Sequence, residues 1–359
     1  MSVVPQVSSH TVTKVNYCEA EDDFTRLLQC DDLDLKIATT PKYVELFENT
    51  LSFAISDAYK KDIASSAAHL FLHRVLYKIN RLKIFWYDDL ENYVNENSAF
   101  LFSIRKKIDS TWQDWEARTI DVNFLKQGDV EAALRKRVAE DLDPEPSPTE
   151  LFFRSEMSSI GYRRLLAISS LDGLVEASQL SRVIGGVGNE VQAMLTKILL
   201  EEYGGGKLAR KHTSFFSTML KAVGMSVKPE AYFEVVPWEV LANINHSFTV
   251  CESKRNFLRY IGSLLYFETS VPAAFQNYKI AGERLGFGYE AIGYWDVHIK
   301  EDIRHGQWML NDVAIPLIDC YKNLAWEIVL GYDQQRFLST RASQAVALSV
   351  GQAEQAESD

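Results

Sequence analysis

Apolar side chains recur at helical spacing along most of this chain. Leu70, Val75, Leu76, Ile79 and Leu82 illustrate the pattern, because residues three or four positions apart share one face of a helix. Segments in which apolar and polar residues alternate, as they do along a half-buried strand, are rare. The pattern therefore predicts an all-α fold.

Proline and glycine divide this helical pattern into segments. Three of the nine prolines fall within residues 143–149, where proline removes backbone donors and disfavours helix in the residue before it. Between Pro41 and Pro144 the only glycine is Gly128. We therefore expect a flexible arm over residues 1–30, an N-terminal helical domain over 31–142, a Pro-rich linker over 143–149, a second helical domain over 150–335 and a frayed tail over 336–359.

The second domain is predicted to consist almost entirely of helices, with glycines between several of them. Its glycine-rich segment 204–206 lacks both a preceding strand pattern and the lysine-serine or lysine-threonine ending of a phosphate-binding loop. The pattern predicts helices over 156–180, 188–203, 207–223, 228–242, 253–269, 273–285, 288–311 and 313–336.

Composition limits the class of protein. The 359 residues include 38 Lys and Arg against 49 Asp and Glu, and this net charge of −11 argues against binding to nucleic acid or to anionic lipid. No apolar run approaches the roughly 18 residues of a membrane span, and the N-terminal residues do not follow the pattern of a signal peptide. The four cysteines form no CxxC pair, which is typical of free thiols in a reducing compartment. We expect a soluble, cytoplasmic protein.

The sharpest candidate for chemistry is the segment 298–305, HIKEDIRH. His298, Asp302 and His305 share one face of a helix. Two imidazoles and a carboxylate on one face suit iron, manganese or zinc. Tryptophan and other large apolar residues flank the segment, so a buried metal site is favoured over a solvated polar face.

Further acids and one imidazole could complete such a site. Glu268 lies on an apolar helical stripe, where an acid needs a partner or a metal, and the same argument applies to Glu176. Glu202 and His212 flank a glycine hinge that could bring both to one metal. Because the glycines break the helix, spacing does not decide between Glu201 and Glu202. Taken singly, each of these acids fits an ordinary salt bridge.

Considered together, the candidates supply four carboxylates and three imidazoles from four helices. Sites of this composition inside helical bundles hold di-iron. Two ferrous ions bring four positive charges and the carboxylates bring four negative charges, so the assembled site would be near neutral and could be buried. The predicted metal ligands are Glu176, Glu202, His212, Glu268, His298, Asp302 and His305.

These motifs resemble those of the haem-oxygenase-like di-iron oxidases, which are also described as iron-containing redox enzymes. The resemblance covers residues 150–335. The motifs that carry it are Glu176, Glu202-Tyr203-Gly204 with His212, Glu268 and His298-x3-Asp302-x2-His305. Its most specific part is the last of these, together with its spacing from the upstream glutamate. It implies a haem-oxygenase-like helical bundle, here preceded by an N-terminal helical domain, with two Fe(II) ions in place of haem. It also implies that O2 is the cosubstrate and reacts through a peroxo-di-iron(III) intermediate.

The resemblance also implies an activity. Glu202 is similar to the additional ligand that marks the amine N-oxygenating branch, so we expect N-oxygenation of an amino acid, free or tethered to a carrier protein, or of a related amine in specialised metabolism. The N-terminal helical region resembles the one that mediates dimerisation in that branch, and an external electron donor is expected. Beyond the seven ligands, no catalytic residue is assigned.

Three alternatives remain open from the sequence. The same metal site could carry out oxidative C–C cleavage or desaturation of an amino or fatty acid. The fold could instead bind haem through one histidine, or the chain could be a non-enzymatic helical interaction protein.

Several aromatic residues and histidines have two interpretations. His69 and His73 are four residues apart, but no acid completes a set at helical spacing, so core or interface positions are favoured over a metal site. Five aromatic residues are candidate pocket walls, although core packing is the favoured interpretation: Phe215, Phe216, Tyr266, Trp295 and Trp308.

Overall fold

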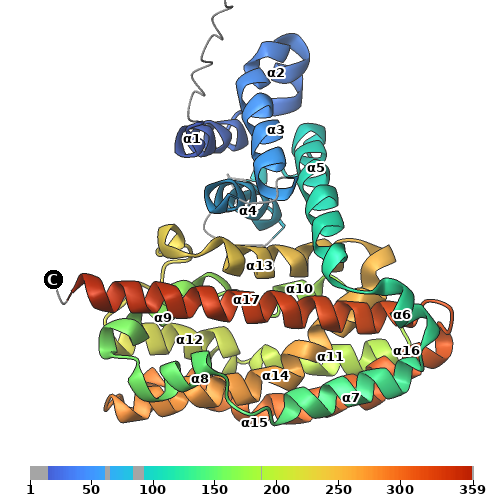
Figure 1. Cartoon of the computed structure of the whole chain (residues 1–359), viewed down its shortest axis with the longest axis vertical. Coiled ribbons are helices and arrows are strands. Elements are labelled where there is room, and N and C mark those ends of the chain that lie inside the picture. The colour runs from blue at the N-terminus through green and yellow to red at the C-terminus, as the bar shows by residue number, and fades with distance from the viewer. Residues whose placement is uncertain (1–14, 61–64, 84–92, 187, 358–359) are drawn as a thin grey trace, which may run out of the picture.

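The computed structural model describes residues 15–60, 65–83, 93–186 and 188–357. Every regular element within these ranges is a helix, which confirms the all-α prediction (Figure 1). The α-helices are α1 (Tyr17–Leu28), α2 (Leu33–Thr39), α3 (Glu45–Tyr59), α4 (Ser66–Arg81), α5 (Ala99–Glu116), α6 (Val122–Gln127), α7 (Val130–Leu142), α8 (Pro148–Leu151), α9 (Ser159–Gly173), α10 (Ser178–Ser181), α11 (Glu190–Glu202), α12 (His212–Ala222), α13 (Trp238–Cys251), α14 (Phe257–Arg284), α15 (Gly293–Trp308), α16 (Ile315–Cys320) and α17 (Trp326–Ala356).

The first helices form a hydrophobic cluster of their own. Buried apolar residues of α1, α3, α4 and α5, including Phe24, Leu72 and Trp112, pack together at one end of the molecule (Figure 1). Helix α4 lies against α13, and the amide of Asn80 donates a 2.9 Å hydrogen bond to Asn245 across this contact. The N-terminal helices are therefore docked onto α13.

Helices α6 and α7 precede the Pro-rich linker but pack with the larger bundle. Leu125 and Leu134 belong to the second hydrophobic cluster, which is built from α9 to α17. Arg137 of α7 forms an ion pair with Asp333 of α17, with 2.6 Å between Nε and Oδ1. The domain boundary at residue 143 stays a prediction, since packing joins these two helices to the helices that follow the linker.

The bundle is organised around α14, which makes its most extensive contacts with α15 and α17. Two separate helices, 253–269 and 273–285, were predicted here, but α14 runs through the gap between them, which contains Pro272. Pro272 has no N–H to donate to the carbonyl of Glu268, four residues earlier, so α14 tolerates one missing hydrogen bond. Gly306 lets α15 lie close to this carbonyl, because a Cβ at Gly306 would be 3.0 Å from its oxygen.

Helices α14 and α17 approach each other through two glycines. A Cβ on Gly262 would lie 1.8 Å from the carbonyl oxygen of Ile328, and a Cβ on Gly331 would lie 1.9 Å from that of Arg259. Any larger side chain at either position would force the two backbones apart. The glycines therefore fix how the two helices lie against each other.

The chain ends differ from the sequence expectation where the structure describes them. The expected frayed tail over 336–359 is helical as far as Ala356, and the expected arm over 1–30 contains α1. In α17 the small apolar residues Leu338, Ala342, Val346 and Val350 recur every four positions and are buried. This stripe was hidden by a composition rich in alanine, serine and glutamine.

Some predicted helix boundaries were wrong. The helix predicted over 228–242 begins only after Pro237 and continues to Cys251, as α13. The helix predicted over 313–336 is interrupted between α16 and α17, and α15 continues into a π-helical segment, Met309–Ala314. Within the described ranges, no helix combines the length and the apolar character that crossing a membrane requires.

Candidate metal centre

Five elements deliver the seven predicted ligands to one place inside the bundle. Glu176 follows the end of α9, Glu202 is the last residue of α11, His212 is the first residue of α12 and Glu268 lies in the middle of α14. The remaining three ligands lie along α15: His298, Asp302 and His305. The structure thus brings together all seven side chains that the sequence singled out.

The seven side chains form two groups of four that share Glu202. In each group the ligand atoms lie within 4.8 Å of one another. The first group contains Glu176, Glu202, His212 and His298; the second contains Glu202, Glu268, Asp302 and His305. Four nitrogen and oxygen donors converging in this way suit a transition-metal ion, and two such groups with one shared carboxylate suit a pair of ions.

Glu202 connects the two groups through its two oxygens. Oε2 lies 2.9 Å from Nδ1 of His212, and Oε1 lies 3.3 Å from Nδ1 of His305. Its neighbour Glu201 is on the outer side, where it forms an ion pair with Arg304 at 2.6 Å. The geometry thus distinguishes the two acids that spacing alone left open: Glu202 joins both groups, whereas Glu201 takes part only in a separate, more exposed group with Glu301 and His305.

Hydrogen bonds to a neighbouring tyrosine orient the donor atoms of two candidate ligands. Nδ1 of His298 donates a 2.8 Å hydrogen bond to the carbonyl oxygen of Tyr294, which leaves Nε2 directed at the first group. The hydroxyl of the same tyrosine donates a hydrogen bond to Oε2 of Glu176. Contacts of this kind fix the ring tautomer and the direction of a metal ligand. Tyr294 was not predicted as a site residue, although its position four residues before His298 places both on one face of α15.

Burial and mutual repulsion perturb the acids of the site. Burial raises the pKa of Glu176 and Asp302 well above their usual values and also raises that of Glu268. Burial acts in the same direction on Glu202, but the imidazoles of His212 and His305 lower its pKa below the usual range. An acid-rich site of this kind needs positive charge to stay buried.

The imidazoles respond to the same environment in opposite directions. Burial lowers the pKa of His298 to about 4. Burial also disfavours the charged form of His305, but the carboxylates of Glu202 and Glu268 outweigh it and raise its pKa to about 11. A proton on His305 therefore partly balances the acids when no metal does.

Orphaned polar atoms show that the residues fit a bound cation. Oε1 of Glu176, Oδ1 of Asp302 and Nδ1 of His305 are buried, and none has a hydrogen-bonding partner among the described residues. Buried polar atoms are normally satisfied, and leaving them without partners is costly. Nitrogen and oxygen donors at these positions are the ligands that non-haem iron takes.

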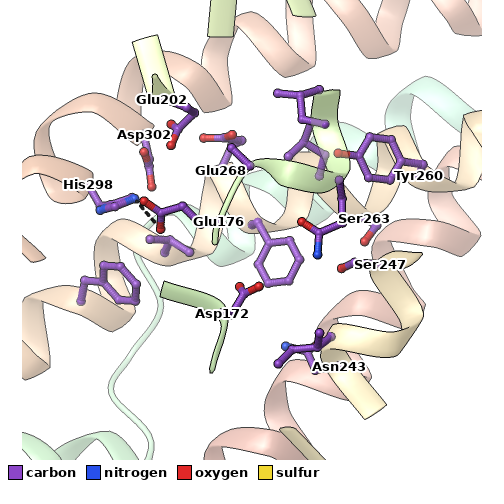
Figure 2. Close-up of a pocket in the computed structure, with 18 of the residues that line it drawn as sticks. Asp172, Glu176, Glu202, Asn243, Ser247, Tyr260, Ser263, Glu268, His298 and Asp302 are labelled. Carbon is purple, nitrogen blue, oxygen red and sulfur yellow. Dashed lines mark ion pairs between the residues drawn. The ribbon is translucent and has the colours of Figure 1, made fainter. Parts of the chain in front are cut away.

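A cavity of about 260 Å³ adjoins the two groups. Five of the seven side chains line it, namely Glu176, Glu202, Glu268, His298 and Asp302. Figure 2 shows these residues at one end of the cavity, with Tyr260, Ser263, Ser247 and Asn243 towards the other end. The two groups of candidate metal ligands are therefore open to a small molecule.

The aromatic walls of the cavity are not the residues that were candidates for this role. None of the five candidates is among the described lining residues; Phe216, for example, packs against Gly173 in the core. The lining instead follows one face of α14, with Tyr260, Leu264, Phe267, Glu268, Val271 and Phe275. The signal was present in the sequence, because these residues continue the stripe of Glu268 at helical spacing.

His69 and His73 lie outside the site. Both are buried where α4 meets α13, and the ring of His69 stacks on that of Trp238 with 4.2 Å between centroids. Neither belongs to a group of metal-ligating side chains within the described part of the chain. They occupy core positions, the interpretation that the sequence favoured.

Two comparisons with known proteins bear on this site. Residues 163–335 match a family described as iron-containing redox enzyme. Over 169 residues, 46% of this chain, the sequence is 28% identical to the nitrosourea synthase of Streptomyces achromogenes subsp. streptozoticus. The match covers 36% of that protein, so the chain spans about a third of the length of the curated relative that it matches.

The family match agrees with the fold and with the donor set. It spans α9 to α17, which together carry all seven side chains, in an all-α bundle of the haem-oxygenase-like class. Through residues 163–335, the chain is thus similar to the iron-containing redox enzymes in sequence, in fold class and in its set of candidate ligands.

Proposed function

We propose that this chain is an O2-dependent, non-haem di-iron oxygenase that transfers oxygen to the nitrogen of a small amine. The observation that carries the proposal is the pair of four-residue groups that share Glu202. One of them would hold a ferrous ion between Glu176, His212 and His298, and the other between Glu268, Asp302 and His305. When bound, the two ions would supply the electrons with which O2 is activated.

The protein's own contribution is to orient ligands and shape a dry cavity. Tyr294 holds Glu176 through its hydroxyl and His298 through its carbonyl oxygen, so two ligands of the first group depend on one residue. Leu264, Phe267 and Val271 make one wall of the cavity apolar. An apolar wall limits the access of water to the reacting atoms.

Two observations favour nitrogen as the atom that is oxidised. The relative is named a nitrosourea synthase, after a product whose nitroso nitrogen carries oxygen. In this chain Glu202 contacts histidines of both groups, as expected of the additional carboxylate ligand of the N-oxygenating branch. An external electron donor would return the iron to the ferrous state after each turnover.

The proposal is tested by anaerobic titration with Fe(II), followed by exposure to O2 and product analysis. We expect about two ferrous ions per chain and a visible absorption change on exposure to O2. His305→Ala should bind fewer ferrous ions and lose the absorption change, whereas Glu283→Gln, an exposed acid of α14, should retain both. With a panel of amines, N-hydroxy, oxime or nitro products would support N-oxygenation. An alkene with a one-carbon fragment would instead indicate C–C cleavage, and no uptake of iron would exclude the proposal altogether.

We also propose that the protein forms a homodimer through its N-terminal helices. The exposed apolar side chains Leu46 and Phe102 on α3 and α5 support this, since both are more than 60% exposed in the single chain (70% and 67%). Light scattering of the wild type and of Leu46→Glu/Phe102→Glu tests it. A monomeric wild type would contradict this proposal.

A further inference from the structure

The cavity contains a carboxylate that the metal-binding groups do not use. Asp172, on the last turn of α9, lines the cavity one helical turn before Glu176. Figure 2 shows it between the metal-binding end and Asn243. Its side chain makes no hydrogen bond and no ion pair with the described residues, although it is accessible from the cavity.

Asp172 leaves the cavity with an excess negative charge. Four lining carboxylates belong to the proposed ligands, Glu176, Glu202, Glu268 and Asp302, and two ferrous ions would balance their four charges. Asp172 adds a fifth carboxylate. A carboxylate that faces a cavity already lined by other acids is stabilised by a cation that it can contact directly.

The lining supplies no such cation. Its described residues include neither lysine nor arginine, and its one histidine, His298, is a proposed ligand. Lys211 is close enough to Glu176 to interact with it electrostatically, but it is not among the lining residues, and its ammonium lies over the ring of Tyr203. The described lining therefore favours an occupant that brings a positive charge of its own.

The same lining is unsuited to a substrate with a free carboxylate. Apart from Asp172 and the proposed ligands, the polar side chains of the described lining are neutral: the amides of Gln179 and Asn243 and the hydroxyls of Ser247, Ser263, Tyr260 and Tyr294. Part of this capacity is already used, since Ser263 donates a 2.6 Å hydrogen bond to Gln335. A substrate carboxylate would add negative charge with no cationic side chain in the lining to pair with it.

We propose that the substrate is a small basic amine without a free carboxylate, and that Asp172 binds a positively charged nitrogen of it. This inference rests on the proposed function, because the charge balance assumes two bound metal ions. A diamine or a guanidino amine has this chemistry. So does a basic amino acid whose carboxyl is tied up in a carrier-protein thioester. Asp172 would position such a molecule with a second, uncharged nitrogen towards the metal-binding groups.

Matched pairs of ligands test this on the full chain, loaded with Fe(II) and kept anaerobic so that no turnover occurs. Calorimetry would compare cadaverine with lysine and agmatine with arginine, because each pair differs only by the carboxylate. Lysinamide would represent the carrier-tethered form, and pentane-1,5-diol would be the neutral control. We expect the decarboxylated member of each pair to bind about tenfold or more tightly, and the diol to bind weakly.

Two variants distinguish the effect of Asp172 on amine binding from the effect of the protein's overall charge. Asp172→Asn should weaken binding of cadaverine and agmatine by about tenfold or more, whereas Asp319→Asn, an exposed acid of α16, should not. Both variants should bind as much iron as the wild type. Lysinamide binding as tightly as cadaverine would point to the tethered source, and lysinamide binding as weakly as lysine would point to a free amine.

Other outcomes would overturn the inference. The inference is wrong if lysine binds as tightly as cadaverine, or arginine as tightly as agmatine. This comparison uses the wild type, so it holds even if Asp172→Asn fails to fold. The inference is also wrong if a folded Asp172→Asn variant binds cadaverine and agmatine with the affinity of the wild type. Failure of the proposed function is recognised separately, because the wild type would then take up no Fe(II) at all.

Discussion

Nε2 of His305 lies 2.9 Å from Oε2 of Glu201, while Nδ1 of the same ring lies 3.3 Å from both Glu202 and Glu268. Glu201 and Glu202, which are adjacent in the sequence, thus contact opposite sides of the His305 ring. Because a carboxylate only accepts hydrogen bonds, Glu201 holds the proton on Nε2 and leaves Nδ1 to face the second group.

Replacing Glu201 should therefore weaken metal binding without removing a ligand. For Glu201→Ala we expect the Fe(II) affinity to fall by about 10- to 100-fold, with the stoichiometry at saturation unchanged. Competition with a chromogenic chelator measures the affinity. Glu301→Gln, which removes another acid near Arg304, is the control and should change it little. A loss of stoichiometry in Glu201→Ala would mean that Glu201 is itself a ligand.

Replacing Glu202 should have a different effect, because this side chain belongs to both groups. Glu202→Gln should lower the bound Fe(II) to about one ion per chain or less, since each group loses a charged donor. Metal analysis after anaerobic gel filtration gives the stoichiometry. Glu283→Gln, in the exposed part of α14, should bind as much iron as the wild type. Full occupancy in Glu202→Gln would contradict the shared position of Glu202.

Much of this site could be predicted from sequence because α15 is a regular helix. Positions 298, 302 and 305 face the same way in any uninterrupted helix, so their spacing was sufficient. The choice between Glu201 and Glu202 was different. It depends on how the chain turns through Gly204, Gly205 and Gly206, which all have positive φ, and no periodicity describes such a turn.

The fold was less predictable where tertiary packing overrides a local signal. Two helices were predicted over 253–269 and 273–285, but α14 continues through Pro272 as one helix that packs against α15 and α17. The stripe of Leu338, Ala342, Val346 and Val350 was too weakly apolar to stand out from its surroundings, yet it is buried along α17. In both cases the deciding contacts come from residues far away in the sequence.

The close contact of α14 with α17 predicts a steric limit at Gly262. Gly262→Ala should lower the free energy of unfolding by about 2 kcal/mol or more, because the added methyl group would collide with the backbone at Ile328. Thermal unfolding followed by circular dichroism measures the effect. Gly185→Ala is the control, since a Cβ there would meet nothing within 4 Å. Equal stabilities of the two variants would show that the helices can separate freely.

Buried histidines away from the site predict that stability falls in mild acid. Burial lowers the pKa of His69 to about 4 and that of His246 to about 3. Unfolded histidines titrate near pH 6.5, so below that pH the unfolded chain binds protons that the folded chain does not. Stability is therefore full above about pH 6.5. It should fall as the pH decreases towards 4, by about 1.4 kcal/mol per pH unit for each such histidine.

Comparing variants isolates this effect, because Asp109, whose pKa burial raises to about 6, acts in the opposite direction. Urea unfolding of the metal-free protein between pH 7 and 4.5, followed by tryptophan fluorescence, gives the slope. His246→Leu should reduce the slope by about 1.4 kcal/mol per pH unit. An identical slope in this variant and the wild type would mean that His246 is protonated in the folded protein.

The glycine contact between α14 and α17 has a consequence for the cavity. One wall follows α14, and the contact of Gly262 with the backbone of α17 holds this helix in close packing along its length. Another part of the lining is formed by Glu176, Ala177, Gln179 and Leu180, beyond the end of α9, where Ala177 has a φ of +60°. The cavity thus joins a fixed surface to a segment outside any long helix. The affinity of the cavity should therefore depend strongly on the length of a molecule along α14. It should depend less on the width of the molecule, because the segment around Ala177 can adjust to it.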